Sequence, residues 1–269
     1  MHKGLAKERP IGIFDSGLGG LTVMKAVMKS LPKEDLVYFG DTARVPYGTK
    51  SPEAIRKFSR QNASVLIARG VKAIVVACNS SSSHALEMLQ RECRVPVIGV
   101  IDPGVRKAMA VTRNNRVGVI ATRATVNSRA YSRRIKSADP RTFVIEKACP
   151  LFVPLVEEGW FSSAVTEQIA QEYLVPLQKT GIDSLILGCT HYPLLKRVLR
   201  KVLGGKIALI DSADETARDL TVLLKKEGLL KQSRKRPCYE FLVSDEPGHF
   251  QKQAKRFLGR DVLKVEKLF

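Results

Sequence analysis

The feature that most constrains this chain is an apolar segment that ends in a cysteine and occurs twice. The first copy, AIVVACNS, covers residues 73–80, and the second, SLILGCTH, covers residues 184–191. A continuous apolar run of this length, bounded by polar residues, is typical of a strand buried in a parallel sheet. Cys78 and Cys189 then stand at the carboxyl ends of their strands, the edge at which open α/β sheets bind ligands.

The repeat extends beyond these two strands. Residues 117–122 (VGVIAT) repeat the pattern of residues 11–16 (IGIFDS), although Ala121 stands where the first half has Asp15. Strands and helices alternate along the chain, which favours parallel sheets. We therefore predict an α/β fold of two pseudo-symmetric domains, each a mostly parallel sheet flanked by helices, with the active site between them.

The paired cysteines suggest several kinds of chemistry. One thiol after an apolar strand is usually a small buried hydrophobe, but two at equivalent places favour a functional pair. Each is expected near a helix N-terminus, which lowers the pKa of a thiol from ~8.5 toward neutrality. Two facing thiols suit a two-base proton transfer at carbon, and Asp15 with His191 or Glu157 could set their protonation. A hydrolase would need only one cysteine and a base, and a thiol–disulfide enzyme would favour neighbouring cysteines.

Composition limits the compartment and the cofactors. The chain has 269 residues, of which 44% are hydrophobic and 26% charged, as is ordinary for a soluble globular protein. Its five scattered cysteines predict neither a disulfide framework nor a metal site. No apolar run approaches the ~20 residues of a membrane span, and residues 1–10 form a short exposed tail without a signal core. We expect a cytoplasmic protein that does not bind a membrane.

The net charge of +19 could attract nucleic acid. However, the basic residues are dispersed, and the only dense cluster covers residues 231–236. Aromatic residues make up only 6% of the chain, so no stacking platform for bases is evident. We expect nucleic-acid binding to be at most weak and non-specific.

Five motifs carry a family resemblance. In chain order they are FDSGLGG (residues 14–20), DTARVPYG (41–48), ACN (77–79), PLFVPLVEEG (150–159) and GCTHYP (188–193). With these motifs, the chain resembles the glutamate racemases of the aspartate/glutamate racemase superfamily, from Ile11 to its final helix. The resemblance implies a cofactor-independent interconversion of L- and D-glutamate that supplies D-glutamate for peptidoglycan.

The resemblance also implies roles for individual residues. Cys78 and Cys189 are the implied catalytic acid/base pair, with Asp15 beside Cys78 and with Glu157 and His191 on the Cys189 side. The implied substrate contacts are Asp15, Ser16, Tyr47, Gly48, Asn79, Ser80, Thr190 and His191. Ser80 departs from the threonine usual in the family, but its hydroxyl is retained.

The same resemblance implies a domain division and an assembly. Residues 1–102 and 211–269 form the first implied domain, residues 103–210 form the second, and the protein is expected to be a homodimer. Within the fold the substrate could instead be aspartate or a hydantoin, but the motif at residues 41–48 argues for glutamate.

Local patterns add narrower expectations. Residues 155–160 are expected to be a loop with two carboxylates, Glu157 and Glu158, of which the resemblance favours Glu157. A helix over residues 163–181 is expected to be interrupted near proline, and a strand is expected at residues 262–265. His84 is expected to be a surface residue.

Overall fold

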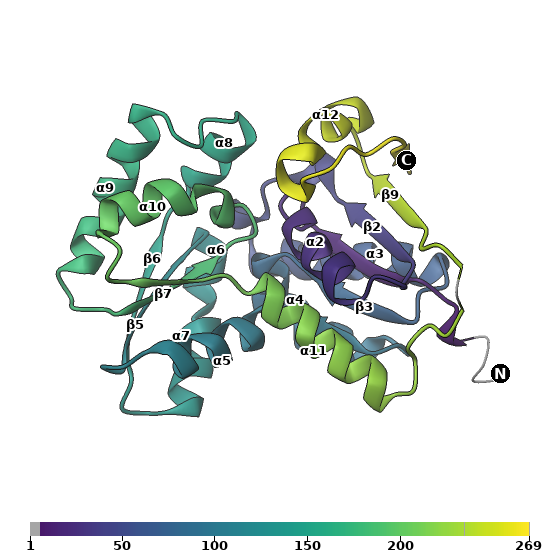
Figure 1. Cartoon of the computed structure of the whole chain (residues 1–269), viewed down its shortest axis with the longest axis horizontal. Coiled ribbons are helices and arrows are strands. Elements are labelled where there is room, and N and C mark those ends of the chain that lie inside the picture. Colours follow the sequence, from purple (N-terminus) through teal and green to yellow (C-terminus); the bar gives the residue numbers. More distant parts are fainter. Residues whose placement is uncertain (1–5, 234, 269) are drawn as a thin grey trace.

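The computed structural model describes residues 6–233 and 235–268, so the first half of the predicted N-terminal tail lies outside the described residues. Its architecture is two parallel sheets set side by side, each flanked by helices (Figure 1). This confirms the predicted fold class. Among the described residues, no helix is long and apolar enough to cross a membrane.

The first sheet has the strand order β10-β9-β2-β1-β3-β4, and all of its pairs are parallel. Its N-terminal strands and helices are β1 (Ile11–Asp15), α2 (Leu21–Ser30), β2 (Leu36–Gly40), α3 (Pro52–Ala68), β3 (Ala73–Val76), α4 (Asn79–Glu92) and β4 (Val97–Gly99). Two short 3-10 helices, η1 (Thr42–Arg44) and η2 (Tyr47–Thr49), lie between β2 and α3.

The second sheet has the order β6-β5-β7-β8. The elements of this half are α5 (Ile101–Val111), β5 (Arg116–Ala121), α6 (Arg123–Ser128), α7 (Ala130–Ala138), β6 (Phe143–Ala148), α8 (Phe152–Glu157), α9 (Ala164–Gln178), β7 (Ser184–Gly188), η3 (Tyr192–Leu195), α10 (Lys196–Leu203) and β8 (Ala208–Ile210). β1 lies between β2 and β3 in the first sheet, and β5 lies between β6 and β7 in the second, so the sequence repeat is also a structural repeat.

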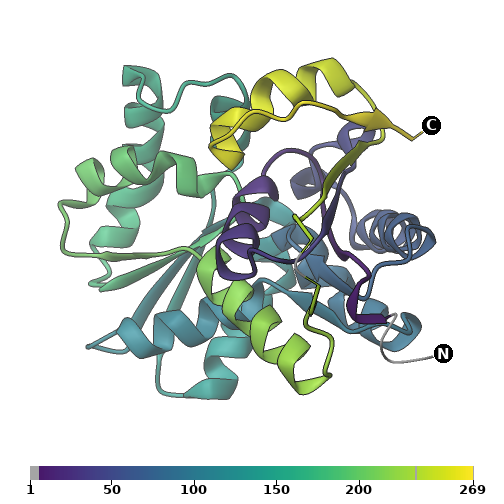
Figure 2. The same ribbon diagram turned by 45° about the vertical axis from the view of Figure 1, so that its right-hand side comes forward.

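The C-terminal part of the chain returns to the first sheet. After α11 (Ala213–Lys226), β9 (Tyr239–Val243) pairs with β2, and α12 (Pro247–Leu258) leads to β10 (Glu266–Lys267). Both views show β9 in yellow-green and α12 in yellow beside the N-terminal strands (Figure 2). Helix α11 packs against both α2 and α5. The residue boundaries of the two domains stay a prediction.

The apolar patterns explain the layers. Ile11 and Ile13 of β1 pack in one core cluster with residues of α2 and α11, whereas Phe14 packs on the opposite face with residues of α3 and α4. The side chains of a strand alternate between its faces, so a strand covered by helices on both sides must be apolar throughout. Ser51 caps α3 by accepting a hydrogen bond from the Ala54 amide (3.2 Å), as its Ser-Pro start predicts.

Three local expectations were wrong. Residues 155–157 are helical in α8, because buried Phe152, Leu155 and Val156 give the segment an apolar face. Helix α9 continues through Pro176, which lies in its last turn. Residues 262–265 do not form the predicted strand, and the last strand begins at Glu266. The carbonyls of residues 262 and 263 instead accept hydrogen bonds from Nε2 of Gln251.

Candidate active site

The two cysteines occupy equivalent positions on the two sheets. Cys78 follows β3 and is the N-cap of α4, and Cys189 follows β7. Both are buried, and both line one cleft between the two halves. The structure therefore brings together the two thiols that the sequence separates by 111 positions.

Most of the predicted site residues line this cleft. Those that do are Ser16, Tyr47, Gly48, Cys78, Asn79, Ser80, Glu157, Cys189, Thr190 and His191. Asp15 does not line it, but it is fully buried next to Ser16 and takes part in the same polar contacts. The cleft walls come from the residues that follow β1, β3, β5 and β7, from residues 45–48 after β2, and from α8 after β6, all at the ligand edge of the two sheets.

The Cys189 side of the cleft carries a chain of polar contacts. His191 lies with Nδ1 3.8 Å from the Cys189 sulfur and with Nε2 3.0 Å from Oε1 of Glu157. Burial opposes a charged imidazole, but the hydrogen bonds to Cys189 and Glu157 outweigh it and raise the pKa of His191 to about 10. An imidazolium at this position places a positive charge beside the Cys189 sulfur. Phe257 of α12 packs edge-on against the same ring, so the C-terminal segment also holds it.

The Cys78 side has different partners. Its sulfur lies 3.8 Å from the Ser16 hydroxyl. Burial, followed by the negative charge of Asp15, raises the pKa of the Cys78 thiol to about 12. The expectation that a helix N-terminus would lower this pKa is wrong for Cys78, because burial outweighs it. The two thiols thus have unlike surroundings: one has an imidazolium beside it, and the other has a carboxyl.

Asp15 connects the two halves of the site. Its carboxylate accepts hydrogen bonds from the Gly17 amide (3.0 Å) and from the Thr190 hydroxyl (3.4 Å), which lies next to Cys189 in the chain. Burial raises the pKa of Asp15, while the charge of His191 partly offsets this effect. Asp15 is therefore more than a cap of the following turn.

Polar residues of the first half are held by residues of the second. Tyr131 of α7 donates a hydrogen bond to Oδ1 of Asn79 (2.7 Å), which leaves the Asn79 NH₂ group free to donate. The Ser80 hydroxyl lies 2.9 Å from that of Thr122, which also lines the cleft. The sequence reasoning missed Thr122 and Tyr131. The repeat contained the signal for Thr122, because it occupies the position of Ser16 in the second half.

His84 lies elsewhere. It is half-buried, and its Nε2 lies 2.9 Å from the Ala124 carbonyl. It lines a cavity of about 610 Å³ that contains neither reactive cysteine. That cavity is larger than the cleft, but the chemistry of the paired thiols favours the cleft as the reaction site.

Comparison with known proteins identifies relatives over nearly the whole chain. Residues 11–220 match the family model described as "Asp/Glu/Hydantoin racemase". A glutamate racemase of Geobacter metallireducens is 52% identical over 251 residues, 93% of each chain, and one of Neisseria meningitidis is 49% identical over 97% of each. The solved structure of the Francisella tularensis glutamate racemase in complex with D-glutamate has a TM-score of 0.92 at 44% identity, with 98% of each chain covered.

Proposed function

The chain belongs to the Asp/Glu/hydantoin racemase family, and we propose that this amino-acid racemase interconverts L- and D-glutamate by proton transfer between Cys78 and Cys189. The observation that carries the proposal is the placement of two buried thiols on one cleft, each at the carboxyl end of its own sheet. The D-glutamate bound in the structure of the Francisella tularensis relative supports the choice of substrate.

The proposed reaction has two proton transfers. With Cys189 as a thiolate beside the imidazolium of His191, its sulfur removes the α-proton of one enantiomer. Cys78, whose raised pKa keeps it protonated, delivers its proton to the opposite face of the planar intermediate. For the other enantiomer, Cys78 is the base and Cys189 the acid. No redox change occurs, and one proton enters the product for each proton removed.

Hydrogen-bond donors around the cleft suit the two carboxylates of glutamate. We propose that the free NH₂ group of Asn79, the hydroxyls of Ser16, Ser80 and Thr190, and the backbone of Tyr47 and Gly48 contact the substrate. Asp15 and His191 act on the protonation of the thiols, and Glu157 acts through His191. Of the two neighbouring glutamates, only Glu157 lines the cleft.

We extend the proposal to the cellular role and the assembly. The D-glutamate product supplies peptidoglycan synthesis in the cytoplasm, the enzyme is a homodimer, and residues 1–102 with 211–269 and residues 103–210 are its two domains. These points are supported by the family resemblance. Rescue of a bacterial strain that requires D-glutamate tests the role, and light scattering after gel filtration tests the dimer.

The decisive experiment measures D-glutamate formed from L-glutamate by the wild type, C78S and C189S. Serine has a much higher pKa than a thiol, so we expect racemisation to collapse in both variants. Aspartate and a hydantoin are assayed in parallel, and faster turnover of either one would change the substrate assignment. Full activity in either serine variant would remove that cysteine from the mechanism.

A further inference from the structure

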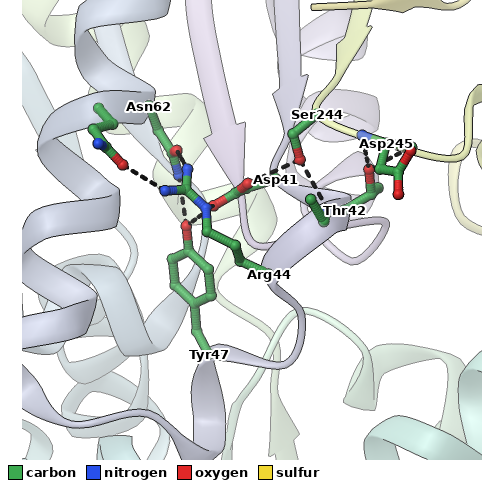
Figure 3. Close-up of polar contacts among 9 residues, drawn as sticks. Asp41, Thr42, Arg44, Tyr47, Asn62, Ser244 and Asp245 are labelled. Carbon is green, nitrogen blue, oxygen red and sulfur yellow. Dashed lines mark hydrogen bonds and ion pairs between the residues drawn. The ribbon is translucent and has the colours of Figure 1, made fainter. Parts of the chain in front are cut away.

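The carboxylate of Asp41 lies outside the cleft but holds one of its walls. Asp41 directly follows β2, is fully buried, and accepts hydrogen bonds from Nε of Arg44 (2.7 Å), the Ser244 hydroxyl (2.9 Å) and the Tyr47 hydroxyl. A buried carboxylate is stable only when such donors surround it. The three donors come from three short segments, so Asp41 ties these segments together (Figure 3).

The Tyr47 hydroxyl is fully engaged in this network. It donates to Asp41 and accepts a hydrogen bond from Nδ2 of Asn62 (3.0 Å). Figure 3 shows the hydroxyl pointing toward these two residues from α3 and from the end of β2. Burial and the nearby charge of Asp41 raise the pKa of Tyr47, so the hydroxyl keeps its proton. A phenol has one proton to donate, so Tyr47 has none left for a substrate.

The part of this segment that reaches the cleft is therefore the chain around Tyr47. Residues 45–48 all line the cleft. The fit is close, because a Cβ added to Gly48 would lie 2.6 Å from the Cβ of Thr122 on the opposite wall. A small shift of the segment would change the shape of the cleft, and a misplacement of ~1 Å can reduce an enzyme's rate about 100-fold.

The C-terminal segment supports the same wall from behind. Ser244 follows β9, and its hydroxyl accepts a hydrogen bond from the Ala43 amide (2.9 Å) while it donates to Asp41. The Asp245 amide donates to the Thr42 hydroxyl (2.9 Å), which donates in return to the Asp245 carbonyl. These contacts hold the first two residues of η1 in place, so the first and last parts of the chain both fix the path to residues 45–48 (Figure 3).

We propose that Asp41 is a positioning residue of the racemase: it anchors the Tyr47 hydroxyl so that residues 45–48 present their backbone to the substrate. Tyr47 in this account is an anchor and not a direct side-chain ligand of glutamate. The inference rests on the proposed glutamate racemisation for its kinetic readout, but the anchoring itself can be measured without any activity.

The first test compares D41N with E34Q, a matched control. Glu34 is a buried carboxylate of the same half that pairs with Lys72 (2.5 Å) and does not line the cleft. Both variants are expected to lower the melting temperature. Only D41N is expected to raise the hydrogen-exchange rate of the amides of Val45, Tyr47 and Gly48, and to lower kcat/KM for both enantiomers by about 10- to 100-fold.

The second test is a double-mutant cycle with Y47F, which removes the hydroxyl and keeps the ring. If Tyr47 acts through Asp41, Y47F lowers kcat/KM in the wild type but has little further effect in D41N. Equal effects of Y47F in both backgrounds would show a direct substrate contact and overturn the proposal.

Unchanged exchange at residues 45–48 in D41N would also overturn the proposal, whatever reaction the enzyme catalyses. An inactive wild type with the expected exchange pattern would instead refute glutamate racemisation alone. It would leave the anchoring role of Asp41 supported.

Discussion

Replacing Glu157 by glutamine tests how the Cys189 side of the cleft is charged. Oε1 of Glu157 lies 3.0 Å from Nε2 of His191, and this contact, together with the hydrogen bond from His191 to Cys189, overcomes burial and raises the pKa of the imidazole to about 10. Glutamine keeps the size of the side chain and an oxygen acceptor but removes the negative charge. We therefore expect the pKa of His191 to fall in E157Q.

The size of this fall follows from the strength of the contact. A hydrogen bond to a charged group contributes about 1.5–3 kcal/mol, and ~1.36 kcal/mol corresponds to one pKa unit. The Glu157 side chain is 30% exposed, so solvent screening favours the lower end of this range. The expected pKa of His191 in E157Q is about one unit lower. An imidazolium with a lower pKa loses its proton at lower pH, so the alkaline limb of kcat/KM moves down by about one pH unit.

The assay measures kcat/KM for L- and D-glutamate between about pH 6 and 11. The variants are E157Q and E158Q, because Glu158 is the next residue, is exposed and does not line the cleft. The two enantiomers have equal free energies in water, so their kcat/KM values must stay equal in every variant, which checks the data internally. NMR of the His191 ring follows the same titration directly.

Two results would refute this reasoning. An alkaline limb in E157Q at the wild-type pH would show that the carboxylate does not control the charge of His191. An equal shift in E158Q would show that a general change in surface charge, and not the contact to His191, moves the profile.

Three further predictions follow from the site and the composition. Racemisation of L-glutamate in deuterated water should place deuterium at Cα of the D-product while recovered L-substrate stays largely unlabelled at early times; early label in both would indicate a single base. Y131F leaves the buried Asn79 oxygen without its donor. Urea unfolding should therefore show a free energy of unfolding lower by about 1–3 kcal/mol, and KM should rise by a larger factor than kcat falls; an unchanged KM would separate Asn79 from substrate binding. Nucleic-acid binding measured by filter retention should weaken steeply with added salt, and salt-resistant binding to one sequence would contradict this.

Most of the fold could be predicted from the sequence, because the fold depends on local patterns. Apolar runs and helix caps define the strands and helices, and the repeat of residues 11–16 at 117–122 predicts two similar sheets. Parallel strands then place Cys78 and Cys189 at the ligand edge without further information. The loop predicted for residues 155–160 is wrong in its first part, because residues 155–157 continue the helix α8, and Pro154 lies in the first turn of that helix, where a proline is tolerated.

The contacts across the cleft could not be predicted in the same way. Tyr131 reaches Asn79, and Phe257 reaches His191, only after both halves have folded and packed. The pKa of Cys78 shows the same limit. The helix N-terminus beside Cys78 can be predicted from the sequence, and it alone would lower the pKa of the thiol. The burial of Cys78 and its proximity to Asp15 arise only from tertiary packing, and they raise this pKa.

The unequal surroundings of the two thiols have a consequence for the proposed reaction. When Cys189 removes the proton and Cys78 delivers one, turnover leaves Cys78 as a buried thiolate, the form that its raised pKa of about 12 disfavours. The enzyme then returns to its starting state only after a proton passes from Cys189 back to Cys78. Asp15 affects this step, because its negative charge further disfavours the Cys78 thiolate. Burial also raises the pKa of Asp15. A neutral Asp15 carboxyl would remove that repulsion. The second half has Ala121 at the equivalent position, so this carboxyl has no counterpart there.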